Sequence, residues 1–100
     1  MEEYTLKIWL EEAIRRFGPD PLNWNFVCPT CGHVQCGEDF AKINPPLAKD
    51  PKNIAYQECI GRYDKKAGGC DFVAYGLISS DIVVIAPCGE VHVFPFAEET

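Results

Sequence analysis

The chain has 100 residues, of which 47% are hydrophobic and 24% charged, a composition typical of one compact globular domain and not of a disordered tail or a fibre. Fifteen acidic against nine basic residues give a net charge of -6, which argues against generic binding to phosphate backbones. The longest apolar run, residues 82–86, is far shorter than the roughly 18 residues of a membrane span. The chain opens with the acidic residues MEEY, where a secretory signal would be basic and then apolar, so we expect a cytoplasmic protein.

An amphipathic helix is predicted over residues 6–17, because apolar side chains recur there at spacings of three, four and seven. Thr5 is the expected N-terminal cap. Gly18-Pro19 ends the helix, since glycine accepts the left-handed conformation and proline cannot continue a helix. The stripe expected to face the core comprises Leu6, Trp9, Leu10, Ala13, Ile14 and Phe17.

Six cysteines are many for a chain of this length. In the absence of an export signal, metal binding is a better interpretation than disulfide pairing. The segment Cys28-Pro29-Thr30-Cys31-Gly32 carries two thiols separated by two residues. Such a pair binds one ion from a tight turn, over which the glycine lets the backbone fold.

A second pair of ligands, Cys59 and Cys70, is flanked by glycines, although ten residues separate its cysteines. We assign one structural Zn²⁺ to Cys28, Cys31, Cys59 and Cys70, because four protein ligands close the tetrahedral sphere and leave no position for substrate. The sequence leaves open whether Cys36 or His33 replaces one of these four. Cys36 is expected to cap or pack a helix, and Cys88, in a turn, to be a free surface thiol.

Short elements are predicted around the first cysteine pair. Residues 24–27 and 33–36 are expected to form antiparallel strands on either side of the metal turn. A one-turn helix over residues 38–43 follows. Residues 44–51 contain three prolines, which exclude both a regular helix and a central strand, so a loop is expected there.

Further strands are expected to deliver the second pair and to close the chain. Residues 54–60 are predicted as the strand leading to Cys59, and residues 72–78 as the strand leaving Cys70. A β-hairpin is predicted over residues 82–96, with strands at 82–85 and 91–96. Pro95 lacks an amide donor, which places the last strand at an edge, and residues 97–100 are expected to fray.

Together these elements predict an α+β fold in which an N-terminal helix precedes a small zinc-ribbon-like antiparallel β domain with a C-terminal hairpin. The whole chain, residues 1–100, is expected to form a single zinc-stabilised domain. Within it the zinc-binding region spans residues 24–78.

The chain resembles a family of small phage- and prophage-encoded zinc-ribbon-like proteins over about residues 5–97. The residues that carry the resemblance are 26–35 (FVCPTCGHVQ), 38–40 (EDF), 57–62 (QECIGR) and 69–71 (GCD), with similar likeness in the helix ending and the closing hairpin. The resemblance implies a viral origin, hence a bacterial host cell, and a zinc-stabilised fold, but no particular reaction. Cys36 and Cys88 are not part of the pattern.

The favoured function is a non-enzymatic, acidic module that binds a host protein or protein complex, for example as an inhibitor of host defence. Its carboxylates would face a basic groove that normally takes nucleic acid. The candidate partner-binding residues are Glu11, Glu12, Glu38 and Asp39.

Nucleic-acid binding is the alternative, resting on Arg62, Lys65 and Lys66 with Tyr63 as a stacking aromatic. The net negative charge disfavours it. Catalysis is not expected, and no catalytic residue is assigned. The candidate nucleophiles Cys36 and Cys88 lie near His33 and His92 only at spacings that chance produces in a cysteine-rich chain.

Overall fold

The computed structural model describes residues 2–43, 50–64, 66, 68–75 and 82–97. Helix α1 covers Leu6–Phe17, the predicted range. The N–H of Ile8 donates to Thr5 Oγ1 at 3.2 Å, which confirms the N-cap. At the other end Gly18 has φ of 93° and donates its N–H to the Ile14 carbonyl at 2.8 Å. None of the helices in the described ranges is long and apolar enough to cross a membrane.

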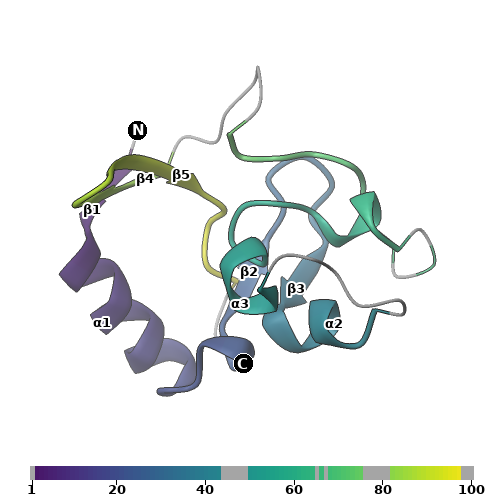
Figure 1. The fold of residues 1–100 in the computed structure, drawn as a ribbon, viewed down its shortest axis with the longest axis horizontal. Coiled ribbons are helices and arrows are strands. Elements are labelled where there is room, and N and C mark those ends of the chain that lie inside the picture. Colours follow the sequence, from purple (N-terminus) through teal and green to yellow (C-terminus); the bar gives the residue numbers. More distant parts are fainter. Residues whose placement is uncertain (1, 44–49, 65, 67, 76–81, 98–100) are drawn as a thin grey trace.

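A three-stranded sheet in the order β1-β4-β5 lies against α1 (Figure 1). The predicted hairpin is confirmed as β4 (Ile82–Ala86) and β5 (Gly89–Val93), paired antiparallel. A further strand, β1 (Glu2–Thr5), was not predicted and pairs in parallel with β4. Its four residues carry no alternating pattern of their own, so only the exposed edge of β4 makes them a strand.

The last strand is shorter than predicted, because the chain leaves the sheet after Val93. The following residues run beside β2 (Asn25–Val27), where Val27 N donates to the Pro95 carbonyl at 3.0 Å and Ala97 N to the Asn25 carbonyl at 2.9 Å. Ala97 is buried, so its predicted fraying is wrong. Residues 98–100 lie outside the described ranges.

The β2 strand and β3 (Val34–Cys36) form the predicted antiparallel pair around the first cysteine turn. Helix α2 (Gly37–Ala41) follows directly and matches the predicted one-turn helix approximately. Cys36 occupies its N-cap position, and its backbone N–H donates to Asp39 Oδ2 at 3.0 Å. The expected capping role of Cys36 is therefore confirmed.

The strand predicted over residues 54–60 is wrong, and residues 72–75, the described part of the strand predicted to leave Cys70, do not form one. The segment before Cys59 contains the short helix α3 (Pro51–Ile54), which begins there because Asp50 caps it and proline suits the first helical position. Two short 3₁₀ turns complete the described elements, η1 (Pro21–Asn23) and η2 (Ile60–Arg62). The described part of the predicted strand 72–78 contributes one isolated bridge, between Val73 and Glu58, and residues 76–78 lie outside the described ranges.

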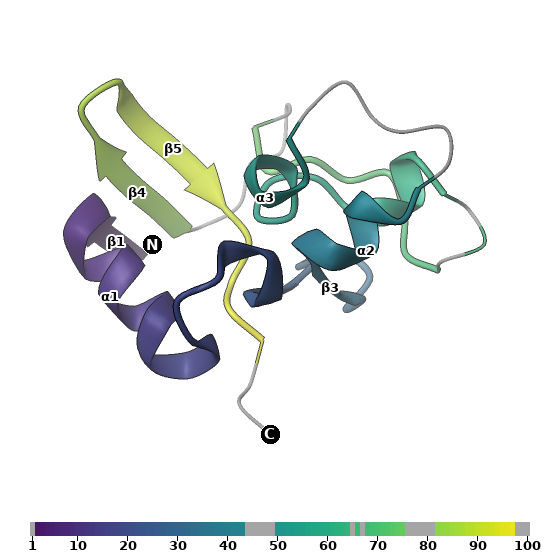
Figure 2. The same ribbon diagram turned by 60° about the horizontal axis from the view of Figure 1, so that its bottom comes forward.

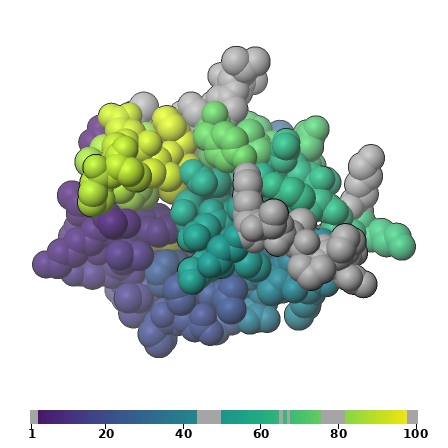
Figure 3. Space-filling model, in the orientation of Figure 1, coloured from purple at the N-terminus to yellow at the C-terminus, as the bar shows by residue number. Residues whose placement is uncertain are grey.

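Aromatic side chains join the two halves of the molecule seen in Figures 1 and 2, the sheet with α1 and the β2–β3 pair with α2 and α3. Trp9 lies at their centre, with its ring centroid 5.4 Å from that of Tyr56 and 5.8 Å from that of Phe96. In Figure 3 the teal atoms around α3 lie directly against the purple atoms of α1 and the yellow-green atoms of the hairpin, so the space between these elements that looks open in Figure 1 is filled. This packing confirms the α+β class with a C-terminal hairpin.

Candidate metal centre

The first knuckle, residues 28–32, is a tight turn leaving β2. Gly32 N donates to the Cys28 carbonyl at 2.8 Å, and Cys28 N donates to the His33 carbonyl at 3.0 Å. Gly32 has φ of 78°, a conformation that favours glycine. The turn leaves Cys28 buried and Cys31 exposed, so one ligand belongs to the core and the other faces solvent.

The second knuckle is formed by Cys59 and Cys70 around the η2 turn. Cys70 N donates to Cys59 Sγ at 3.2 Å, and Cys59 N donates to the Phe72 carbonyl at 2.9 Å. Two glycines make this approach sterically possible. A Cβ on Gly61 would lie 2.3 Å from the Cys70 carbonyl oxygen, and one on Gly69 would lie 2.7 Å from Cys59 Sγ. Glycine is therefore required at both positions, because a Cβ would clash with the Cys70 backbone at one and with the Cys59 sulfur at the other.

The four sulfur atoms of Cys28, Cys31, Cys59 and Cys70 all lie within 4.8 Å of one another. The Sγ atoms of Cys28 and Cys70 are 3.7 Å apart, and those of Cys31 and Cys59 are 3.8 Å apart. Zinc–sulfur bonds of about 2.3 Å in a tetrahedron require sulfurs about 3.8 Å apart, whereas a disulfide requires about 2 Å. This set of residues, the metal centre, can therefore hold one tetrahedral metal ion.

Burial and hydrogen bonding together set the pKa values of the free thiols. It raises the pKa of Cys28 to about 12 and is the main cause of the raised pKa of Cys70. At Cys31 the effect of burial is outweighed by hydrogen bonding from the His33 backbone and from the neighbouring thiols, which lowers the pKa. A metal ion binds thiolates and must displace these protons, so metal binding at this centre releases protons.

Neither alternative ligand joins the cluster within the described part of the chain. The Cys36 sulfur lies 3.6 Å from Asp39 Oδ2, at the start of α2. Burial raises the pKa of the Cys36 thiol, and the Asp39 charge adds to the effect. The His33 ring lies beside Gly68 and Gly69. A Cβ added to Gly68 would lie 3.5 Å from the ring, and one added to Gly69 would lie 3.6 Å from it. Cys88 is exposed in the hairpin turn, as expected.

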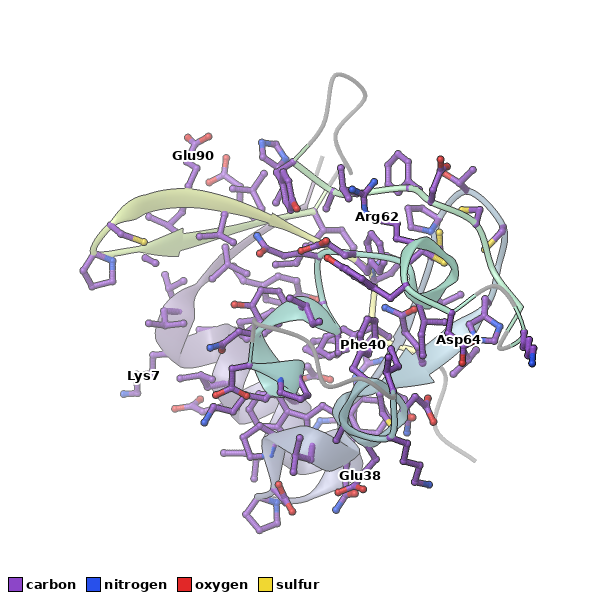
Figure 4. The ribbon with its side chains drawn as sticks, turned by 45° about the vertical axis from the view of Figure 1, so that its right-hand side comes forward. Lys7, Glu38, Phe40, Arg62, Asp64 and Glu90 are labelled. Atoms are coloured by element: carbon purple, nitrogen blue, oxygen red, sulfur yellow. The ribbon has the colours of Figure 1, made fainter. Side chains whose placement is uncertain are left out.

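Two of the residues predicted for nucleic acid, Arg62 and Tyr63, contact the second knuckle instead. The buried Glu58 carboxylate accepts a hydrogen bond from the Tyr63 hydroxyl and lies 3.6 Å from Arg62 Nε. Arg62 also donates to the Asp71 carbonyl at 3.0 Å. Figure 4 places Arg62 and Phe40 on the side of the molecule away from Lys7 of α1.

Tyr63 and the two lysines of that set differ in accessibility. The half-buried Tyr63 ring meets Phe40 edge-on, with centroids 6.3 Å apart. Lys66 is exposed, and Lys65 lies outside the described residues. The Tyr63 ring is thus packed against Phe40, a residue of the protein's core.

The predicted acidic residues divide between two helices, which lie apart in Figures 1 and 2. Glu11 and Glu12 belong to α1, whereas Glu38 and Asp39 open α2. Asp39 caps α2, and Glu12 is bound by both Arg15 and Arg16. Hydrogen bonds from these arginines lower the pKa of Glu12 to about 2. The four acidic residues do not form one acidic surface.

The outer face of α1 carries exposed apolar side chains that the sequence analysis missed. Ile14 was predicted to face the core, yet it is 46% exposed, and Ile8 is 50% exposed. Ile14 lies at the margin of the apolar stripe, about 100° round the helix from the buried Ala13. The exposed Glu11 lies between the two isoleucines along the helix. The helical period alone could have identified this face.

One family model matches residues 5–97, and its description is VVA0879-like. Neither the curated proteins nor the solved structures contain a match to the chain. Because the family model covers all but seven of the 100 residues, the chain belongs to the VVA0879-like family.

Proposed function

We propose that this protein is a zinc-stabilised, non-enzymatic module that binds another protein. The observation that carries the proposal is the convergence of four thiols from two knuckles that are 28 residues apart in sequence, from Cys31 to Cys59. An all-sulfur tetrahedral set suits zinc or an iron–sulfur centre. Zinc is the better choice because four cysteine ligands, one pair of them two residues apart, form a common structural zinc set.

A closed coordination sphere supports a structural role for the ion. Four protein ligands leave no position for water or substrate, whereas catalytic zinc keeps one open. Cys36 is a poor nucleophile, since its pKa is raised by burial and by the adjacent Asp39. In the proposed function, the protein therefore acts by binding a partner through its surface and not by catalysis.

The outer face of α1 is the surface we propose for the partner. Ile8, Glu11 and Ile14 combine exposed apolar area with an acidic group on a rigid helix, a composition suited to a partner surface with an apolar hollow and a basic rim. The net charge of -6 would speed the encounter with such a partner. The resemblance to phage proteins favours a complex of the bacterial host, such as a defence or nucleic-acid-processing complex.

The alternative, a nucleic-acid-binding zinc ribbon, has less support. Tyr63 and Arg62 would have to leave Glu58 to stack on bases or pair with phosphates. Only Lys66, of the described members of the set, is exposed without such a tie.

Affinity purification from host cells, with nuclease treatment, tests the proposal through three variants of the whole chain. We expect Glu11→Lys and Ile14→Asp to reduce recovery of a stoichiometric protein partner at least tenfold, and Lys66→Glu to leave it unchanged. High salt should weaken the complex because it screens the charges. Recovery of nucleic acid that only Lys66→Glu abolishes would support the alternative instead.

A further inference from the structure

Gln35 is a polar side chain in the core beside the metal centre. It lies in the middle of β3 and is only 1% exposed. A buried amide costs free energy unless its donors and acceptor are bonded. Gln35 has partners for all of them, so the cost of burial is offset by specific contacts.

The three hydrogen bonds of Gln35 all go to the segment that carries Cys59. Its Nε2 donates to the Ala55 carbonyl at 2.8 Å and to the Glu58 carbonyl at 2.7 Å. Its Oε1 accepts from Ile60 N at 2.9 Å. A single side chain thus connects β3 of the first knuckle to the backbone of the second.

Two of these contacts hold the peptide groups on either side of Cys59. The Glu58 carbonyl belongs to the peptide bond before Cys59, and the Ile60 N–H to the peptide bond after it. Each peptide group is planar, so fixing both of them fixes the Cα–Cβ direction of the cysteine between them. The Cys59 sulfur is itself fully buried and meets the Cys31 sulfur at 3.8 Å.

We propose that Gln35 is the positioning residue of the metal centre: its amide sets the orientation of Cys59 relative to the first knuckle. The inference rests on the proposed metal-binding role. β2 and β3 frame the first knuckle, and Gln35 pairs with Phe26, two residues before Cys28. Through its amide the same strand pair sets the orientation of the third ligand, Cys59, relative to the first two in the folded protein.

The expected consequence is a loss of metal affinity when the amide is removed. Residues that orient metal ligands typically contribute about 10- to 100-fold to affinity. Gln35→Met keeps the length of the side chain but leaves the Glu58 carbonyl and Ile60 N–H without their partner. We expect it to weaken metal binding by about 10- to 100-fold and to alter the ligand-field absorption of bound Co²⁺.

Gln57→Met is the matched control. It makes the same change of side chain two residues before Cys59, but the Gln57 amide donates to the His92 carbonyl of β5, at 3.4 Å, and holds neither peptide group next to Cys59. Each purified full-length protein is titrated with Co²⁺, and a chromogenic chelator then competes for Zn²⁺. Thermal unfolding is measured alongside, so that lost stability is separated from lost affinity.

The proposal requires a weaker affinity and a changed cobalt spectrum for Gln35→Met, with both near wild type for Gln57→Met. Wild-type affinity and spectrum in a folded Gln35→Met protein overturn it. Should that variant fail to fold, Gln35→Glu decides in the same way, because it keeps the length and the acceptor for Ile60 but loses both donors. If the wild-type protein binds neither Co²⁺ nor Zn²⁺, the metal centre itself is contradicted. If the wild type and all variants bind these ions equally, the metal centre stands and only the role of Gln35 is overturned.

Discussion

At the scale of single residues, glycines in the two knuckles serve different purposes. Gly32 is needed for its backbone conformation, with φ of 78° and nothing within 4 Å of an added Cβ. Gly61 is needed for space, because a Cβ there would lie 2.3 Å from a backbone atom of Cys70. The same residue type therefore protects the metal centre from strain in one knuckle and from a clash in the other.

This difference predicts the effects of two alanine substitutions. Gly61→Ala must displace backbone and should destabilise the protein by about 3 kcal/mol, with loss of the bound metal. Gly32→Ala adopts a strained but open conformation and should cost about 1 to 2 kcal/mol while the metal is retained. Thermal unfolding and elemental analysis measure both quantities. Equal losses for the two variants would contradict the assigned roles.

Glu12 gives a second prediction, on pH. Its pKa is lowered from 4.5 to about 2 by hydrogen bonds from Arg15 and then Arg16. A carboxyl whose pKa is lowered by folding stabilises the native state above its unfolded pKa and loses that effect as pH falls through the folded value. Glu12→Gln should therefore be less stable than wild type at neutral pH, where the carboxylate is ionised and the thiolate ligands can still hold the metal. Because both the folded and the unfolded pKa of Glu12 lie below about pH 5, the difference should stay constant between about pH 8 and pH 6. Equal stability of the two proteins in urea unfolding over this range would be inconsistent with the pairing.

At the scale of elements, α1 has an inner face that packs into the core and an outer face that exposes apolar side chains. Trp9 is buried and contacts Trp24, Phe26, Tyr56 and Phe96. Ile14, two turns from the start of the helix, is half exposed. The two faces of the helix therefore differ in what they contribute to stability: the inner face packs the core, and the outer face is exposed.

Substitutions on the two faces of α1 should differ in their effects. Trp9→Ala leaves a large cavity and should destabilise the protein by about 3 to 5 kcal/mol. Ile14→Ala should change the free energy of unfolding by no more than about 0.5 kcal/mol. Chemical denaturation followed by circular dichroism provides the comparison. A large loss on Ile14→Ala would mean that this side chain supports the fold and does not remain available for binding.

At the scale of the whole molecule, one metal ion would join two segments that share few other backbone connections. The described hydrogen bonds between the β2–β3 pair and the Cys59 segment come mainly from the Gln35 side chain. Structural zinc contributes about 10 to 16 kcal/mol in small domains, comparable to the total stability of about 5 to 15 kcal/mol of a typical protein. The folded state should therefore depend on the ion.

Removal of the metal should unfold the protein. Treatment with a strong zinc chelator is expected to abolish the cooperative thermal transition, and re-addition of Zn²⁺ to restore it under reducing conditions. Cys28→Ser should reproduce the loss, whereas Cys88→Ser, at an exposed thiol, should bind one ion per chain as wild type does. A chelated protein that keeps its native circular dichroism spectrum would contradict a structural role.

The sequence by itself determined the features that depend on local physics. The helix over residues 6–17 follows from its period and its caps, and the hairpin from β-branched runs around a turn. The first cysteine pair is local in the same sense. The second pair followed from the need for four ligands and from the glycines that flank it, and the structure brings those four sulfurs together.

The tertiary structure alone decided the features that depend on distant partners. Residues 2–5 become a strand because they pair with the edge of β4. Phe96 does not continue the hairpin, because it forms an isolated β-bridge with Phe26 of β2. The segment before Cys59 is apolar enough for a strand, yet Asp50 and Pro51 start a helix there, and Gln35 binds the backbone on its C-terminal side. Gln35 and Glu58 look like surface residues in the sequence, and only the fold surrounds them with the backbone groups and side chains that satisfy their buried polar atoms.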